Sequence, residues 1–295
     1  MLIAVAVARD DCRAQIGCVQ SGVTPQMPTF VATLNSLFMG TFLFESIIFG
    51  PVKSRRLGIS LGVNLPPVDS KVCSFNCIYC ECGWTASMNV SRFPTREQVR
   101  NALGQKLQEM AEAHESLDVI TFAGNGEPTL HPDFPGIIDD TLALRDAHYP
   151  RARVAVLSNA TMIFRPEVRS ALMRVDQNIL KLDSAVEDTM RRLDQPLMRH
   201  SVDALIGNMR LFEGWLIVQT MFLRGSIDGH PIDNTTPAEV QAWLDALEQV
   251  RPRQVMVYTI ARDTPAVGLQ KVPLDDLETI AAQARARGFD VQVSG

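Results

Sequence analysis

The sequence predicts an α/β fold in which six strand–helix units form an open parallel barrel, that is, a partial (β/α)6 barrel. The first observation is that short apolar runs alternate regularly with helical stretches, which favours parallel strands joined by right-handed crossovers. The second is that runs such as VAVL (154–157) and VMVYTI (255–260) are nearly continuously apolar, as strands buried on both faces are. Six units are too few to close an eight-stranded barrel.

The expected elements follow one another from residue 57 onward. The first helix begins at Pro94-Thr95, because apolar residues then recur at helical spacing through Met110. The other helices are expected at 134–145, 166–173, 202–212, 237–250 and 274–287. Strands are expected at 57–65, 117–123, 154–157, 178–182, 215–222 and 254–260, with a seventh at 289–293.

The 295 residues are enough for one large α/β domain or two small ones, and 46% of them are hydrophobic, as in an ordinary soluble globular protein. We divide the chain into an N-terminal extension, 1–48, and a domain, 49–295. We expect the extension to be poorly ordered or to reflect a misplaced start, with Met39 as the natural first residue. It lacks a basic signal-peptide start and the ~20 uninterrupted apolar residues of a membrane span, so no membrane contact is expected.

The net charge and the cysteines bear on nucleic-acid binding and on the cellular location of the protein. A net charge of -5 and a pI near 5.6 give no overall attraction to nucleic acid. The cysteines are clustered and no export signal precedes them, which predicts a cytoplasmic location, where thiols stay reduced.

Four of the six cysteines fall within ten residues, directly after the first expected strand. Cys73, Cys77 and Cys80 are spaced C-x3-C-x2-C, so their thiolates can converge on one metal centre. Three ligands leave a coordination position open, whereas structural zinc sites and electron-transfer clusters usually have four protein ligands. Cys82 is a possible fourth ligand, which would close the site.

Polar groups follow the next strands, at the ends where parallel α/β folds place their reactive residues. The second strand is followed by Gly124-Asn125-Gly126-Glu127. The glycines permit close approach to a ligand, and the Glu127 carboxylate could accept a hydrogen bond from an ammonium group. The alternative is an ordinary turn, which has the same composition. Ser158 and Asn159 follow the third strand. They suit a ribose or carboxylate, or simply a helix cap.

The fourth and fifth strands carry further candidates. Lys181 and Asp183 lie on the same side of their strand, and charges buried there must pair with each other or with a ligand; the alternative is a surface ion pair. Gln219, within the fifth strand, is a candidate contact for cofactor or substrate.

The cysteine spacing, with Tyr79 before the last cysteine, resembles the radical S-adenosylmethionine (SAM) superfamily. There, three cysteines bind a 4Fe–4S cluster whose fourth iron is chelated by SAM. The 124–128 segment is similar to the glycine-glycine-glutamate-proline motif that holds the SAM amino group, with Asn125 in place of a glycine. Residues 49–84 resemble uncharacterised Fe–S oxidoreductases related to the wyosine-tRNA enzymes, and glycyl-radical activating enzymes are also similar.

The resemblance implies that Cys73, Cys77 and Cys80 are the metal ligands and that Cys82 is not. It implies an enzyme whose reduced cluster passes one electron to SAM, and whose 5′-deoxyadenosyl radical abstracts hydrogen from substrate. The substrate stays open among a small molecule, a partner protein and a tRNA, and the electron donor would be a protein such as flavodoxin or ferredoxin. The alternative is a non-catalytic iron–sulfur module. The expected cofactor-binding residues are Tyr79, Gly124, Asn125, Gly126, Glu127, Ser158, Asn159, Lys181, Asp183 and Gln219.

Overall fold

The computed structural model describes residues 42–54, 57–85 and 88–295. Its main sheet has eight strands in the order β1-β2-β3-β4-β5-β6-β9-β11. All neighbours in this sheet are parallel except β1 and β2. The strands are β1 (Ile48–Ser54), β2 (Gly58–Val63), β3 (Val119–Phe122), β4 (Arg153–Ser158), β5 (Gln177–Lys181), β6 (Ile217–Met221), β9 (Gln254–Tyr258) and β11 (Val291–Ser294).

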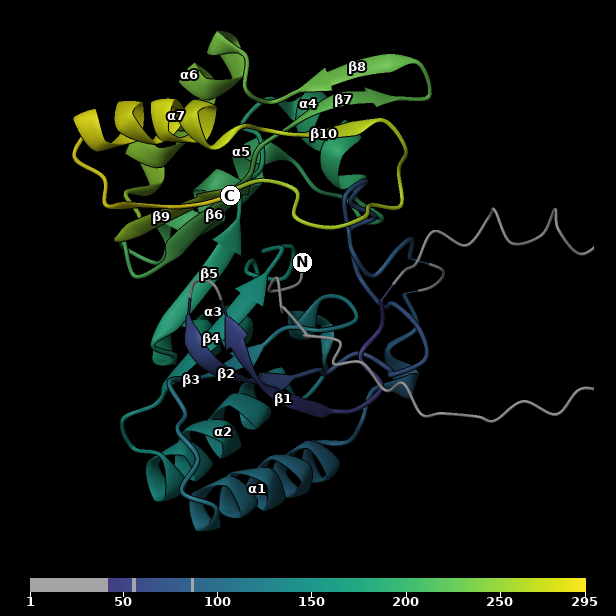
Figure 1. Ribbon diagram of the computed structural model, residues 1–295, viewed down its shortest axis with the longest axis vertical. Coiled ribbons are helices and arrows are strands. Elements are labelled where there is room, and N and C mark those ends of the chain that lie inside the picture. The colour runs from purple at the N-terminus through teal and green to yellow at the C-terminus, as the bar shows by residue number, and fades with distance from the viewer. Residues whose placement is uncertain (1–41, 55–56, 86–87) are drawn as a thin grey trace, which may run out of the picture.

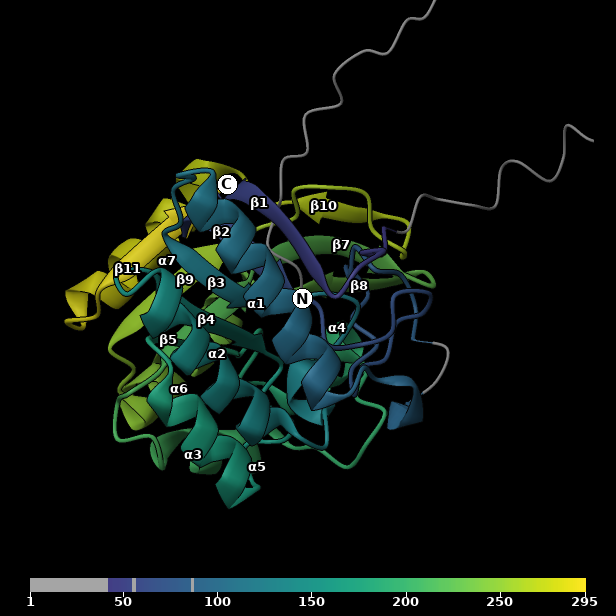
Figure 2. The ribbon, with the colours of Figure 1, turned by 90° about the horizontal axis from the view of Figure 1, so that it is seen from below.

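Helices cover the outer face of this curved sheet (Figures 1 and 2). Outward-facing strand residues such as Leu61, Ile120 and Leu180 join the apolar faces of the helices in the main core. The helices are α1 (Arg96–Glu112), α2 (Phe134–His148), α3 (Pro166–Arg174), α4 (Glu187–Asp194), α5 (Val202–Arg210), α6 (Pro237–Val250) and α7 (Leu274–Ala286), with short 3-10 helices at Val90–Arg92 and Pro128–Leu130.

The inner face of the sheet changes from apolar to polar along the strands. Val119 and Ile217, at the beginnings of β3 and β6, and Ile179, in the middle of β5, pack into a separate apolar cluster. Because side chains alternate across a strand, Lys181 and Gln219 lie on the same face as Ile179 and Ile217 but two residues later. The polar part of the barrel interior therefore lies toward the C-terminal ends of the strands.

The predicted partial barrel is confirmed. Six strand–helix units follow one another, and β11 adds the expected seventh parallel strand beside β9. The sheet begins with β1 and ends with β11, so the barrel stays open. The antiparallel strand β1 was not expected, because its sequence, IFGPVKS, is interrupted by Gly50-Pro51.

The polar stretch that follows β6, where no strand was expected, forms a hairpin. Its strands β7 (Leu223–Ile227) and β8 (His230–Asp233) pair with each other, and β7 also pairs with β10 (Leu269–Lys271). Asp228 and Gly229, at φ of 50° and 78°, form the two-residue turn. Asp-Gly is a strong hairpin signal, because both turn positions need a positive φ.

The described end of the N-terminal segment packs against the domain. Phe44 is buried, and its ring stacks on Phe49 with centroids 3.6 Å apart. The division at residue 48 stays a prediction. Met39, Cys12 and Cys18 lie outside the described residues. Within the described ranges, none of the helices combines the length and the hydropathy that crossing a membrane requires.

Candidate functional site

The cysteine loop, 72–82, is joined to the glycine loop that follows β3. Val72 and Gly126 form a parallel bridge: the Val72 amide donates to the Asn125 carbonyl at 2.9 Å, and the Glu127 amide donates to the Val72 carbonyl at 3.1 Å. Gly126 has a φ of 146°, and a Cβ there would lie 1.8 Å from the Val72 oxygen. Only glycine permits this contact, so the two loops form one unit.

The other side of the cysteine loop is held by the C-terminal end of α4. The Asn76 amide donates to the Asp194 carbonyl at 2.9 Å, and the Ile78 amide donates to the Leu193 carbonyl at 3.0 Å. Neither α4 nor this contact was expected from the sequence.

Segments that precede and follow the cysteine loop in the sequence also contact it. The Phe42 amide donates to the Glu81 carbonyl at 3.0 Å, and the Ala266 amide donates to the Ile78 carbonyl at 3.2 Å. Arg262 forms an ion pair with the Glu81 carboxylate at 2.9 Å. The loop is therefore fixed by residues that lie far from it in the sequence.

All four cysteines of the loop are buried and free. The Cys73 sulfur accepts from the Asn159 side-chain amide at 3.5 Å, and the Cys77 sulfur lies 3.6 Å from an Asp194 carboxylate oxygen. Burial raises the pKa of the Cys73 and Cys77 thiols, whereas a hydrogen bond from Cys82 lowers the pKa of Cys80. Metal binding would therefore have to displace protons from the buried thiols.

Lys71 supplies a buried positive charge beside these thiols. Its side chain is 4% exposed and its ammonium donates to the Gly83 carbonyl at 2.8 Å. Burial opposes the charged form, but the thiolates of the three predicted ligands outweigh it and raise the pKa of Lys71. Among the described residues, Lys71 forms no ion pair with a carboxylate.

This donor set fits an anionic iron–sulfur cluster. A buried cation without a counter-ion is costly, and a cluster with thiolate ligands would supply the missing negative charge. In the described ranges, no three His, Cys, Asp or Glu side chains are grouped so as to hold a metal ion. In a 4Fe–4S cluster each cysteine binds a different iron atom. The cysteine sulfur atoms are therefore farther apart than those of cysteines that bind a single metal ion.

The Glu127 carboxylate connects the ends of β3 and β4. One oxygen accepts from the Ser158 hydroxyl at 2.8 Å and from Thr129, and the other accepts from the Asn159 amide at 2.6 Å. Burial raises the pKa of Glu127, and these hydrogen bonds oppose the shift. The carboxylate expected to receive an ammonium group thus already has partners from its own chain.

Asn125 also has its side chain fully engaged. Its oxygen accepts from the Phe44 amide at 2.8 Å, and its nitrogen donates to the carbonyls of Phe44 and Pro67, each at 2.9 Å. In this structure Asn125 therefore connects the N-terminal segment to the glycine loop. Gly124 and Gly126, on either side of Asn125, leave the backbone there without side chains.

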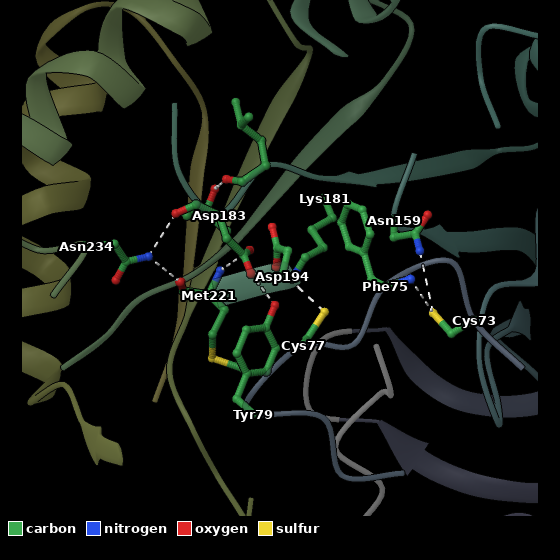
Figure 3. A network of polar contacts seen from close by, with 12 residues as sticks. Cys73, Phe75, Cys77, Tyr79, Asn159, Lys181, Asp183, Asp194, Met221 and Asn234 are labelled. Atoms are coloured by element: carbon green, nitrogen blue, oxygen red, sulfur yellow. Dashed lines mark hydrogen bonds and ion pairs between the residues drawn. The ribbon is translucent and has the colours of Figure 1, made fainter. Parts of the chain in front are cut away.

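Tyr79, Lys181 and Asp183, predicted separately, meet in one buried network (Figure 3). The Lys181 ammonium pairs with Asp183 and, at 2.9 Å, with Asp194. It also lies 4.4 Å from the centre of the Tyr79 ring, whose hydroxyl donates to Asp183. The Asn234 side chain donates to the Asp183 carbonyl at 2.8 Å. Burial, opposed by Lys181, raises the pKa of Asp194 to about 7.

Gln219 lies beside Lys181, since the two residues are partners in the β5–β6 ladder. Its side chain is fully buried, and neither its amide oxygen nor its amide nitrogen has a hydrogen-bond partner among the described residues. An unsatisfied buried amide group costs about 1–3 kcal/mol. Such a group marks a place where a ligand would supply the missing partners.

Sequence reasoning missed Lys71 and Asp194. Lys71 carried a signal, as the only charge between Asp69 and Glu81. Asp194 ends α4, whose acidic first turn (Glu187, Asp188) and basic last turn are typical of a helix.

A parallel half-barrel with four buried free cysteines in the loop beyond its first parallel strand is the arrangement that the sequence led us to expect of an iron–sulfur protein. The family model of the radical SAM superfamily matches residues 68–212, and the chain belongs to that superfamily. The 4Fe–4S cluster and SAM that the sequence led us to expect are the cofactors of this superfamily.

Two relatives and one solved structure are similar to this chain. A UPF0026 protein of Methanocaldococcus jannaschii is 34% identical over 188 residues, which are 62% of this chain and 55% of the relative. A UPF0026 protein of Synechocystis is 31% identical over 74% of this chain and 77% of its own length. The crystal structure of a radical SAM methyltransferase from Sphaerobacter thermophilus matches with a TM-score of 0.60 and 17% identity, over 80% of this chain and 65% of that one. The chain thus spans about half the length of the archaeal relative, and the solved structure supports the fold.

Proposed function

We propose that the chain binds a 4Fe–4S cluster through Cys73, Cys77 and Cys80, cleaves SAM beside it, and abstracts hydrogen from a polar substrate in the barrel interior. When bound and reduced, the cluster supplies the electron that splits SAM into methionine and a 5′-deoxyadenosyl radical. Gln219 carries the substrate part of this proposal, because its unpartnered amide lies at the polar end of the inner face.

The proposed SAM contacts fall into two groups. Tyr79, Ser158, Asn159, Lys181 and Asp183 would face the cofactor from the cysteine loop and the ends of β4 and β5. Asn125 and Glu127 would act mainly by holding the loops, because their polar atoms bind Phe44 and Asn159. The backbone between Gly124 and Gly126 would present its amides and carbonyls to the cofactor at close range.

The polar groups of the interior indicate the chemistry of the substrate. The amide nitrogen of Gln219 donates and its oxygen accepts, so a substrate group that both accepts and donates, as an amide does, would pair with both atoms. The Lys181 ammonium is already balanced by Asp183 and Asp194. Lys181 therefore has no unbalanced positive charge with which to bind an anionic group of the substrate.

Anaerobic reconstitution with iron and sulfide, followed by SAM and dithionite, tests the proposal by mass spectrometry of 5′-deoxyadenosine. The wild type and Cys82→Ala should form 5′-deoxyadenosine, and Cys77→Ala should lose the cluster. A cluster that ignores SAM and disappears in Cys82→Ala would instead identify a four-cysteine electron-transfer module. The four free, buried cysteines suit the reducing cytoplasm proposed for the protein.

A further inference from the structure

A cavity of about 740 Å³ opens on the helix-covered side of the domain. It lies between the turn after β4, the segment connecting α4 to α5, and α5 itself. We call it the basic cavity; Phe164, Arg191, Met198, Arg199, His200 and Asn208 are among its lining residues. Leu205, another lining residue, belongs to the outer core between helices and sheet, so this wall of the cavity lies on the helix side of the sheet.

The lining of the basic cavity contrasts with the rest of the protein. It contains two arginines and a histidine and no acidic residue, although the chain as a whole has a net charge of -5. Arg191 is partly neutralised by Glu187 at 2.6 Å, but Arg199 is exposed and forms no ion pair among the described residues. Phe164 is 53% exposed, so an apolar ring lies among the positive charges.

One wall of this cavity is in contact with the cysteine loop. The His200 ring packs against the Phe75 ring with centroids 5.2 Å apart, and the Phe75 amide donates to the Cys73 sulfur at 3.5 Å. Thr161, also in the lining, lies 2.6 Å from Ser74 between their hydroxyl oxygens. Figure 3 shows Phe75 and Asn159 beside Cys73. A single residue, Phe75, thus separates His200 in the wall from Cys73.

We propose that the basic cavity is the docking surface for an acidic one-electron carrier protein that reduces the cluster; this rests on the proposed function. Charge complementarity favours an acidic partner, and the exposed Phe164 supplies an apolar centre for the contact. Docking there brings the carrier to the Cys73 side of the loop and leaves the barrel interior free for substrate. With a flavodoxin as the carrier, the reduced flavin would lose one electron and become the semiquinone, and the oxidised cluster would take up that electron; no bond would form or break.

The binding test uses the reconstituted protein, with an acidic flavodoxin as the probe, by calorimetry at low and at physiological salt. Arg199→Glu should weaken binding on the order of tenfold at low salt, with a smaller effect at higher salt, because exposed charges are screened. Phe164→Ser should weaken it at both salt concentrations. Arg151→Glu is the matched control: this exposed arginine precedes β4, at the opposite end of the strand, and should bind like the wild type.

A comparison of reductants separates this proposal from the proposed function. With dithionite, which needs no docking surface, Arg199→Glu should form 5′-deoxyadenosine at the wild-type rate; with reduced flavodoxin it should be several-fold slower. No 5′-deoxyadenosine from the wild type with dithionite would refute the proposed function, while the calorimetry would still decide the docking. Equal flavodoxin affinity in Arg199→Glu and wild type would overturn the proposed docking surface. If Arg199→Glu lost tRNA binding while flavodoxin binding stayed unchanged, the proposal would also be overturned.

Discussion

The Lys71 ammonium donates to the Gly83 carbonyl at 2.8 Å, so a single buried cation spans the two ends of the cysteine loop. The same charge lies beside the three predicted cluster ligands, whose thiolates raise its pKa. Lys71 therefore combines two effects, closure of the loop and electrostatic stabilisation of a negatively charged group inside it.

Replacing this charge should change the cluster more than the fold. In Lys71→Met, the reduced cluster loses a nearby cation, so its midpoint potential should fall in a potentiometric EPR titration. Lys71→Arg, which keeps the charge, is the control and should stay close to the wild-type potential. Equal potentials in Lys71→Met and wild type would contradict this electrostatic role.

Gly126→Ala should break the connection between the cysteine and glycine loops. A Cβ at this position meets the Val72 carbonyl, and the φ of 146° is strained for any other residue. We expect a loss of about 3 kcal/mol or more in the free energy of unfolding, measured with urea, and a low iron content after reconstitution. Gly207→Ala, within α5 where a Cβ meets nothing within 4 Å, should be neutral or stabilising.

Gln219→Met should stabilise the fold and remove the proposed substrate contact. The replacement removes two unsatisfied polar atoms while filling a similar volume, so the free energy of unfolding should rise by about 1–2 kcal/mol. Substrate-independent cleavage of SAM should persist. Destabilisation of Gln219→Met would show that the amide has partners in the folded protein and does not await a ligand.

Protonation of His131 should lower the free energy of unfolding below neutral pH. Its ring binds the Pro94 carbonyl through Nε2 and accepts from the Asp133 amide through Nδ1, so protonation of Nδ1 would break the second bond. Burial lowers its pKa in the folded state, and the unfolded state therefore takes up the proton first. The stabilisation is complete above pH ~6.5 and declines as pH falls toward the folded pKa.

Urea unfolding at pH 7.5 and pH 5.5 measures this effect. The wild type should lose up to about 1 kcal/mol more than His131→Gln between the two values, because glutamine does not titrate. An identical loss in both proteins would assign the pH dependence to other groups, of which His200, whose pKa burial also lowers, is the first candidate.

The barrel was predictable because its strands and helices have different apolar periods, as VAVL at 154–157 and the stripe from Val99 to Met110 show. The cysteine, glycine and Lys181 segments were predictable because parallel strands end at one edge. The Asp228-Gly229 hairpin carried a turn signal that went unused. The contact between Asp194 and the cysteine loop was not predictable, because it depends on where the C-terminal end of α4 packs in three dimensions.

The contacts of Phe42 and Ala266 with the cysteine loop also bear on how the protein is made. Translation proceeds from the N-terminus, and residues near 266 leave the ribosome long after Cys73, Cys77 and Cys80. Until then the Ile78 carbonyl lacks its partner and Glu81 lacks Arg262. Iron would therefore enter a preformed site only after residues up to 266 have been synthesised, and a chain that ends before them would hold its cysteines in a looser loop that is more open to oxidation.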